Sequence, residues 1–331
     1  MNFFFDYRWT GNHGIGRVSK MLDDRLNFKH LPIKGKPSSP LDPLKLFAAM
    51  LLLPNDAIIF SPGYNAPLFT VRPYIFIIHD LNHIDRNENA SFLKKRYYQL
   101  IMRRACRAAF KVLTVSEFSR QRIISWAQLP AEHVVNIGNG VDECFNQDVN
   151  PFVLGYQYFF CVSNRKPHKN EELLLEAFSR AHIDPAIRLL FTGVANDSLM
   201  SKCKALGIDN RVVFYGRVPD EILPGLYRGA IALLFPSLYE GFGLPVIEAM
   251  ACGTPVMTSN ATSLPEVAGD AALLVDPLDI TGISKAIETI VSDGTLRSEL
   301  VARGLERAKQ FSWDSVFSKV KSVLDDVENK V

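Results

Sequence analysis

The sequence predicts an α/β protein made of two doubly wound domains that face one another across a cleft. Apolar runs typical of buried parallel strands alternate along the chain with segments of helical periodicity. Each half also has a glycine-rich loop directly after a strand, which is where open α/β sheets bind ligands. With 331 residues, of which 47% are hydrophobic and 22% charged, the chain is long enough for two domains that each bury a core.

The composition excludes several classes of function. The net charge of +2 gives no basic field for nucleic acid. The five cysteines are scattered without a C-x-x-C pair, which is typical of reduced thiols and predicts neither a zinc site nor any other metal or cofactor. The N-terminal MNFFFDYRW is expected to be a first strand, not a signal peptide. The most apolar window, Leu44 to Leu53, is too short to span a bilayer. We therefore expect a cytoplasmic protein that is not integral to a membrane.

After the first strand, TGNHGIGRVSKML forms a permissive loop that enters a helix at about Arg17. The glycines Gly11, Gly14 and Gly16 follow a G-x-x-G-x-G spacing, and Ser19 occupies the position of a further glycine. The dinucleotide fingerprint is G-x-G-x-x-G, so a dehydrogenase is disfavoured. A loop that cradles an anion and an ordinary tight turn both remain open.

The strand YIFII places His79 and Asp80 at its carboxyl end, the ligand-binding edge of an α/β sheet. An isolated histidine at a strand end is more often structural. Asp80 can either orient the imidazole or contact an acceptor hydroxyl, and both roles stay open. After the strand VLTVS, Ser116 is expected to be a helix N-cap.

A basic helix is predicted at about residues 92–111, which contain no acidic residue and have apolar residues at helical spacing. A helix of this kind can lie on an anionic membrane surface, or it can be a core helix with a solvated charged face. Both interpretations stay open. Its cations are Lys94, Lys95, Arg96, Arg103, Arg104, Arg107 and Lys111.

The second half begins with the strand YQYFFCVS, followed by a loop in which Arg165, Lys166 and Lys169 cluster before a helix. Basic side chains between a strand end and a helix start can clamp a diphosphate. Further on, the strand VVFYG ends in a loop where backbone groups around Gly216 and Arg217 can contact the edge of a nucleobase.

The stretch PSLYEGFGLPVIE joins a buried strand to a short helix and carries two glutamates, Glu240 and Glu248, with seven residues between them. Its glycines let the backbone approach a ligand, and the helix N-terminus attracts phosphate. Glu240 can accept hydrogen bonds from sugar hydroxyls, and Glu248 from both hydroxyls of a ribose. A glutamate pair at this spacing alone is a weak signal.

The wider pattern E-G-F-G-L-P-x-x-E-A-M-A-C-G-x-P-V, from Glu240 to Val256, is specific. It resembles the E-x7-E signature of the retaining glycosyltransferases of family 4, which have the two-domain GT-B fold. The resemblance implies an acceptor-side Rossmann-like domain over 1–150 and a Rossmann-like domain for the nucleotide sugar over 151–311. The last helix, about 312–331, is expected to pack back on the first domain.

The resemblance also implies roles for residues. The family's G-R-x-x-x-x-K diphosphate motif is altered here, because Ser163 and Asn164 take the G-R positions and Arg165 comes one residue late. Lys169 is therefore the safer diphosphate ligand. His79, Arg165, Lys169 and Glu240 are the implied catalytic residues. The implied substrate-binding residues are Gly14, Ile15, Gly16, Arg17, Asp80, Ser116, Gly216, Arg217, Phe242, Gly243, Leu244 and Glu248.

The implied function is transfer of a hexose, with retention and without a metal, from a nucleotide diphosphate sugar to a sugar or lipid-linked saccharide. Surface polysaccharide assembly at the inner face of a membrane is the expected setting. GDP-mannose is favoured over UDP-hexoses, because the S-N-R-K-P-H-K-N variant and the compact chain resemble bacterial enzymes of that process. The alternatives are a sugar-nucleotide epimerase or hydrolase on the same fold, and a non-catalytic nucleotide-sugar-binding protein.

Overall fold

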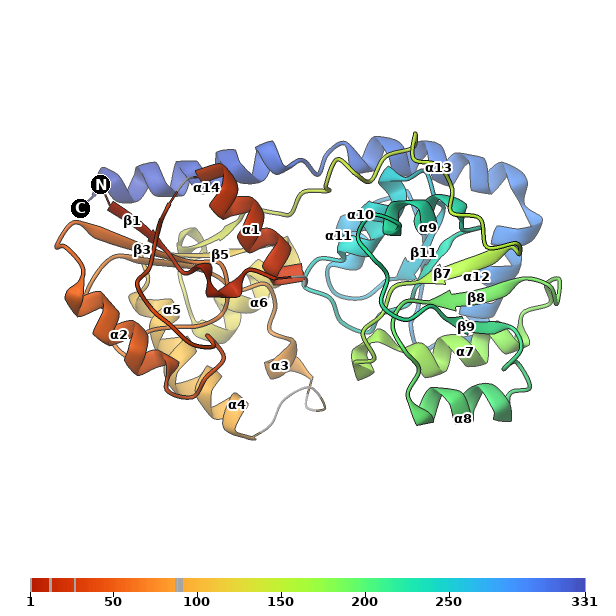
Figure 1. Ribbon diagram of the computed structural model, residues 1–331, viewed down its shortest axis with the longest axis horizontal. Coiled ribbons are helices and arrows are strands. Elements are labelled where there is room, and N and C mark those ends of the chain that lie inside the picture. Colours follow the sequence, from red (N-terminus) through yellow and green to blue (C-terminus); the bar gives the residue numbers. More distant parts are fainter. Residues whose placement is uncertain (1, 12–13, 27, 87, 89–91, 331) are drawn as a thin grey trace. The chain divides into compact units, whose positions relative to one another are not determined.

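The computed structural model describes residues 2–11, 14–26, 28–86, 88 and 92–330. The chain divides into two compact units, which we call unit 1 (residues 1–140 and 313–331) and unit 2 (residues 141–312). Each unit contains one parallel six-stranded sheet with helices on both faces (Figure 1). The predicted α/β class with two doubly wound sheets is therefore confirmed.

The sheet of unit 1 has the strand order β2-β1-β3-β4-β5-β6. Its central strands are buried along their whole length, as expected for parallel strands covered on both faces. The strands are β1 (Asn2–Phe5), β2 (Lys29–His30), β3 (Ala57–Ser61), β4 (Tyr74–Ile77), β5 (Lys111–Thr114) and β6 (Val134–Asn136). The helices are α1 (Gly14–Leu26), α2 (Asp42–Leu52), α3 (Asn82–Asp85), α4 (Phe92–Tyr97), α5 (Arg103–Ala108), α6 (Glu117–Ala127) and α14 (Trp313–Glu328), with short turns η1 (Tyr7–Trp9) and η4 (Ala131–His133).

Helices α2, α5 and α6 pack on one face of this sheet and share a single apolar core with it, in which Met50, Cys106 and Ile123 are buried. On the other face, stacked phenylalanine rings lie beneath α1, with the centroids of Phe5 and Phe60 5.8 Å apart. Helix α14 packs against α1 on this side (Figure 1).

Two element boundaries in unit 1 differ from expectation. The predicted helix over about 92–111 consists of α4, a π-helical turn η3 (Tyr98–Met102) and α5. Helix α1 begins at Gly14 rather than at about Arg17. The start of α1 lies so close to the preceding loop that a Cβ on Gly16 would be 2.1 Å from the carbonyl oxygen of Gly11. Asn12 and His13 of this loop lie outside the described residues.

The sheet of unit 2 has the order β12-β11-β10-β7-β8-β9. Side chains alternate between its faces: Phe159 of β7 lies in the core beneath α7 and α12, whereas the hydroxyl of Tyr158 donates to Leu226 O of α9 on the other face. The strands are β7 (Tyr158–Cys161), β8 (Arg188–Phe191), β9 (Val212–Phe214), β10 (Leu233–Phe235), β11 (Val256–Ser259) and β12 (Leu273–Val275). The helices are α7 (Glu171–Arg180), α8 (Asp197–Ala205), α9 (Leu223–Gly229), α10 (Leu244–Ala251), α11 (Leu264–Ala268), α12 (Ile280–Ser292) and α13 (Gly294–Ala308), with the turn η5 (Pro167–Lys169).

Strand order tells where each sheet can hold a ligand. In unit 2 the chain winds outward in opposite directions from the neighbours β7 and β10, so the loops after these two strands diverge. In open α/β sheets a ligand crevice lies at such a point. In unit 1 the same reversal falls between β1 and β3. The carboxyl ends of these strand pairs are therefore the places to look for functional side chains.

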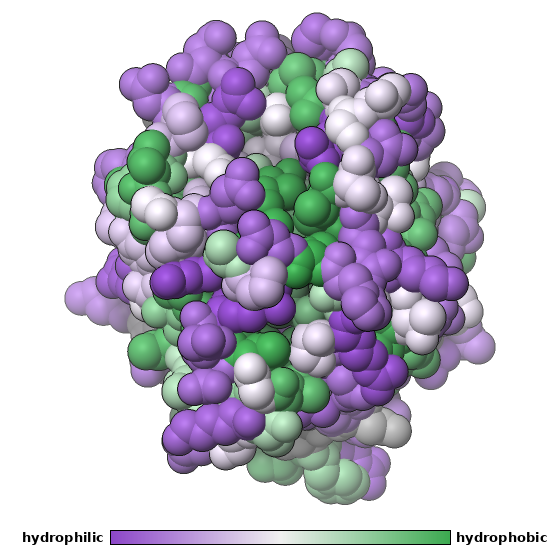
Figure 2. All heavy atoms as spheres, turned by 90° about the vertical axis from the view of Figure 1, so that its right-hand side faces the viewer, coloured by the Kyte–Doolittle hydropathy of each residue, from purple (hydrophilic) through white to green (hydrophobic). Residues whose placement is uncertain are grey.

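The opposite, amino-terminal edge of the unit 2 sheet has a hollow that includes Gln157, Ile187 and Pro255, each just before a strand. Figure 2 faces this part of unit 2 and shows hydrophobic residues between hydrophilic ones. The hollow lies at the strand ends away from the crevice, and none of the predicted site residues lines it. No helix in the described residues combines the length and the apolar character needed to cross a bilayer.

Candidate functional site

Lys169 and Glu240 meet at the crevice of unit 2. Lys169 ends the turn η5 after β7, and Glu240 lies in the loop after β10. The Nζ of Lys169 is 2.7 Å from Oε1 of Glu240, and the two side chains are only 12% and 14% exposed. The ammonium also lies 4.8 Å from the ring centroid of Phe235, over its face. The predicted diphosphate ligand and the predicted sugar ligand are therefore held together as a mostly buried ion pair.

Several contacts fix the two loops to each other. The side chain of Asn170 donates to Pro236 O at 3.1 Å and to Pro277 O at 2.6 Å. The carbonyl oxygen of His168 accepts from Leu238 N at 2.7 Å. Asn170 also adopts a left-handed backbone with φ of 59°. The loops are thus held in a defined and strained arrangement, which is typical of ligand sites.

Arg165 is directed away from this pair. Its guanidinium binds the carboxylate of Glu171 and the carbonyl oxygen of Thr192, and its Nε donates to Val194 O at 2.8 Å. The rings of Phe191 and Phe214 lie 5.5 and 5.1 Å from its guanidinium carbon. All three nitrogens of the guanidinium are therefore engaged inside unit 2, and Lys169 is the cation that faces Glu240.

Glu248 lies one helical turn inside α10 and is buried. Its Oε2 accepts a hydrogen bond of 2.7 Å from the hydroxyl of Tyr227. The backbone before α10 makes a sharp turn at Gly243, whose φ is 111° and where a Cβ would lie 2.6 Å from a methyl carbon of Leu264. Glycine is therefore required at this position. The turn delivers Phe242 and Leu244 to the start of the helix.

Backbone groups around Gly216, after β9, were predicted to contact the nucleobase. The structure shows that Gly216 pairs with another glycine. Gly193 and Gly216 form an isolated antiparallel bridge in which Gly193 N donates to Gly216 O at 2.6 Å and Gly216 N donates to Gly193 O at 3.2 Å. The N–H of Gly216 is therefore already used. Arg217, the next residue, is exposed.

In unit 1, His79 lies two residues after the end of the buried strand β4 and is itself buried. Its Nε2 lies 2.8 Å from the carbonyl oxygen of Pro62, so this nitrogen carries the proton and donates. Asp80 accepts a hydrogen bond of 2.9 Å from the backbone N–H of Asn82 at the start of α3. Burial, together with the charge of Asp80, raises the pKa of the nearby Tyr64.

The remaining predicted residues of unit 1 belong to helix starts. Ser116 is fully buried and accepts from Ser119 N at 3.0 Å, so the predicted N-cap of α6 is confirmed and the side chain presents no surface to a ligand. Gly14, Ile15, Gly16 and Arg17 form the first turn of α1, where Gly14 is exposed and Gly16 is buried.

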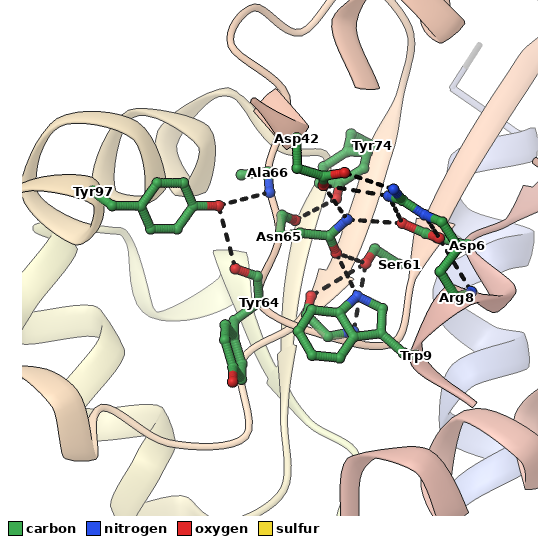
Figure 3. Close-up of polar contacts among 11 residues, drawn as sticks. Asp6, Arg8, Trp9, Asp42, Ser61, Tyr64, Asn65, Ala66, Tyr74 and Tyr97 are labelled. Atoms are coloured by element: carbon green, nitrogen blue, oxygen red, sulfur yellow. Dashed lines mark hydrogen bonds and ion pairs between the residues drawn. The ribbon is translucent and has the colours of Figure 1, made fainter. Parts of the chain in front are cut away.

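A buried ionic network at the carboxyl end of β1 and β3 in unit 1 was not predicted from the sequence (Figure 3). The guanidinium of Arg8 binds Asp6, just after β1, at 2.7 Å and Asp42, at the start of α2, at 2.6 Å. The side-chain amide of Asn65 donates to the same two carboxylates at 2.8 and 3.1 Å, and accepts from Trp9 Nε1 at 2.7 Å. Two carboxylates thus share one guanidinium and one amide away from water.

This network fixes the loop that holds His79. Asn65 lies in the loop after β3 that also contains Pro62, the hydrogen-bond acceptor of His79. The hydroxyl of Tyr74 on β4 donates to Asn65 O at 2.6 Å, which holds the loop against the sheet. Burial raises the pKa of Asp42, an effect that its hydrogen bonds with Arg8 and Asn65 oppose. Burial acts to lower the pKa of Arg8, but the two carboxylates raise it overall.

Comparison with known proteins identifies relatives over most of the chain. The family described as "Glycosyl transferases group 1" matches residues 143–307, and "Glycosyltransferase Family 4" matches residues 22–144. The O-antigen chain mannosyltransferase B of Escherichia coli is 35% identical over 276 residues, which are 79% of this chain and 72% of that protein. The serotype-specific mannosyltransferase WbdA of Escherichia coli is 28% identical, and the match spans only 27% of its length.

Among solved structures, Anabaena HepE in complex with UDP and glucose superposes with a TM-score of 0.76 at 20% identity, covering 98% of this chain and 100% of that one. At this level of identity the likeness concerns the fold alone. The two six-stranded units are thus those of the GT-B fold.

Proposed function

Since the chain belongs to glycosyltransferase family 4, the group 1 glycosyltransferases, we propose that it is a retaining mannosyltransferase that uses GDP-mannose. The acceptor is a sugar or a lipid-linked saccharide of a surface polysaccharide, bound at the cytoplasmic face of a membrane. The mannosyltransferase names of the relatives support the sugar. The pair of Lys169 and Glu240 at the crevice of unit 2 is the observation that carries the proposal.

In this proposal the donor separates the ion pair and binds both of its members. The diphosphate takes the ammonium of Lys169, and the carboxylate of Glu240, released from Lys169, accepts hydrogen bonds from hydroxyls of the sugar. The N–H groups at the start of α10, behind Gly243, add to the positive field. Glu248 accepts the ribose hydroxyls, and Tyr227 orients its carboxylate. Arg165 is proposed to bind the diphosphate only if its ion pair with Glu171 breaks.

The transfer step breaks the bond between the anomeric carbon and the diphosphate oxygen, and forms a bond from that carbon to the acceptor hydroxyl oxygen on the same face. The departing diphosphate accepts the hydroxyl proton, so no protein base is needed. Lys169 stabilises the negative charge that grows on the leaving group. We assign to His79 a role at the reacting carbon of the sugar. Its Nε2–H donates to Pro62 O, which fixes the orientation of the imidazole ring. Asp80 and the first turn of α1, from Gly14 to Arg17, are assigned to the acceptor side, and Arg217 to the base.

A panel of GDP-, UDP- and dTDP-sugars tests the donor. A ligand that binds only the folded protein stabilises it by about 2.7 kcal/mol at a hundred times its dissociation constant, so GDP-mannose is expected to raise the melting temperature most. Transfer to a saccharide acceptor should then give a product with the anomeric configuration of the donor. A shift with UDP-sugars alone would overturn the choice of donor, and donor consumption without an acceptor would indicate an epimerase or hydrolase.

Chelation is expected to leave the reaction unchanged. Lys169 and backbone N–H groups neutralise the leaving diphosphate in this proposal, so the rate with EDTA should equal the rate with added Mg²⁺. Initial rates with purified enzyme, measured after dialysis against EDTA, check this prediction. Loss of activity in EDTA that Mg²⁺ restores would show that a divalent cation shares the role assigned to Lys169.

A further inference from the structure

Helix α2 is apolar on two sides. Its inner side packs in the core of unit 1 through Leu46 and Met50. Its outer side also carries leucines, among which Leu44 and Leu51 are exposed and Leu52 is 86% exposed. A surface helix normally presents polar residues to water, so a leucine-lined outer side indicates that something apolar covers it.

A second exposed apolar and basic side runs along α4, η3 and α5. Phe92 and Leu93 at its start are 70% and 78% exposed, and Leu100 is exposed further along. Arg96 and Arg104 are exposed on the same side of the helical segment. The Arg96 guanidinium lies 5.3 Å from the ring centroid of Phe92. Apolar side chains are thus interleaved with cations, and no acid occurs between residues 92 and 111.

Phe69 joins these two sides into one surface. It lies in the loop before β4, is partly exposed, and its ring is 5.4 Å from the ring of Phe47 on α2. The guanidinium carbon of Arg104 on α5 lies 4.5 Å from the centroid of the Phe69 ring. We call the outer sides of α2 and of α4 to α5, together with residues 67–72, the leucine-basic face. Most of the exposed large hydrophobic residues in the described chain lie on it.

We propose that the leucine-basic face docks unit 1 on an anionic lipid bilayer. The exposed leucines and phenylalanines would enter the boundary between head groups and acyl chains, and the arginines would contact anionic head groups. The charge pattern favours a bilayer over a second copy of this chain, because two copies of a face with Arg96 and Arg104 and no acids along 92–111 would repel one another. The assignment does not depend on which sugar nucleotide the enzyme uses.

Flotation with lipid vesicles tests the proposal without donor or acceptor. The full-length chain is expected to float with vesicles of phosphatidylcholine and phosphatidylglycerol, and less with phosphatidylcholine alone. Binding should weaken with added salt, which screens exposed charges. Arg96→Gln with Arg104→Gln should weaken it by about fivefold per cation. Leu52→Ser with Leu93→Ser should weaken it by at least about tenfold, because both side chains lose their burial in the membrane.

Matched variants in unit 2 are the controls. Val153→Ser with Leu278→Ser removes two apolar side chains that are also largely exposed, at 83% and 68%, and Lys204→Gln with Lys285→Gln removes two exposed cations. Both are expected to bind vesicles like the wild type. All variants should keep the melting temperature and the rate on a water-soluble acceptor, which separates this test from that of the transfer reaction. The proposal is overturned if the wild type fails to float, if the controls lose as much, or if the face variants instead convert a dimer into a monomer.

Discussion

Lys169→Ala is expected to lower the turnover number by about a hundredfold to a thousandfold, the usual cost of removing one group that stabilises a transition-state charge. The loss should appear in kcat as well as in kcat/KM, because the charge on the leaving diphosphate is largest in the transition state. The side chains of Lys169 and Glu240 are only 12% and 14% exposed, so the variant leaves a mostly buried carboxylate without its cation and should also lower the melting temperature. Steady-state kinetics together with a thermal melt measure both quantities.

Two variants in the same region sharpen this test. Lys166→Ala removes an exposed cation from the same loop and should keep most of the activity, which shows that the position of the charge matters. Arg165→Ala should also lower the melting temperature, because it leaves the buried carboxylate of Glu171 without its cation. Near-normal turnover of Lys169→Ala would refute the role of this lysine, whatever the donor.

The sequence predicted much of unit 2 because its signals are local. Apolar runs placed the strands, and Gly243 marked a turn that only glycine can form. It did not reveal that Lys169 and Glu240 form an ion pair, because that contact depends on β7 and β10 being neighbours in the sheet. It also could not show that Arg165 turns inward, since this depends on the partner Glu171 and on carbonyl groups of the next strand.

The ionic network of unit 1 was not predicted for the same reason. Asp6 and Arg8 look like ordinary residues after a strand, and Asp42 looks like a residue at the start of a helix. Only the order β1-β3 and the packing of α2 on that sheet bring the three charges together out of water. A short D-x-R after a buried first strand is the one local sign, and it does not name the distant partner.

Arg8→Met is expected to destabilise unit 1 by about 3–5 kcal/mol, because it leaves Asp6 and Asp42 as neighbouring buried carboxylates without a cation. The effect should depend on pH in a defined sense. The pKa of Asp42 is already raised by burial, so folding favours its protonated form. Its contribution to stability is therefore full below the unfolded-state pKa and is lost as the pH rises through the folded-state pKa. Without Arg8 that folded pKa rises further, so the deficit should be large at neutral pH and shrink toward acid pH.

Urea unfolding of the variant at several pH values measures this. The matched control is Asp6→Asn with Arg8→Met and Asp42→Asn, which removes all three charges and should recover much of the lost stability. An equal deficit at all pH values would mean that lost packing of the Arg8 side chain, and not an unpaired charge, is the cause. Because Asn65 ties the network to the loop that holds His79, the single variant should also lower transfer activity at temperatures where the protein remains folded, and the triple variant should restore part of it. Recovery of stability without recovery of activity would separate the charge balance of the network from its positioning of His79.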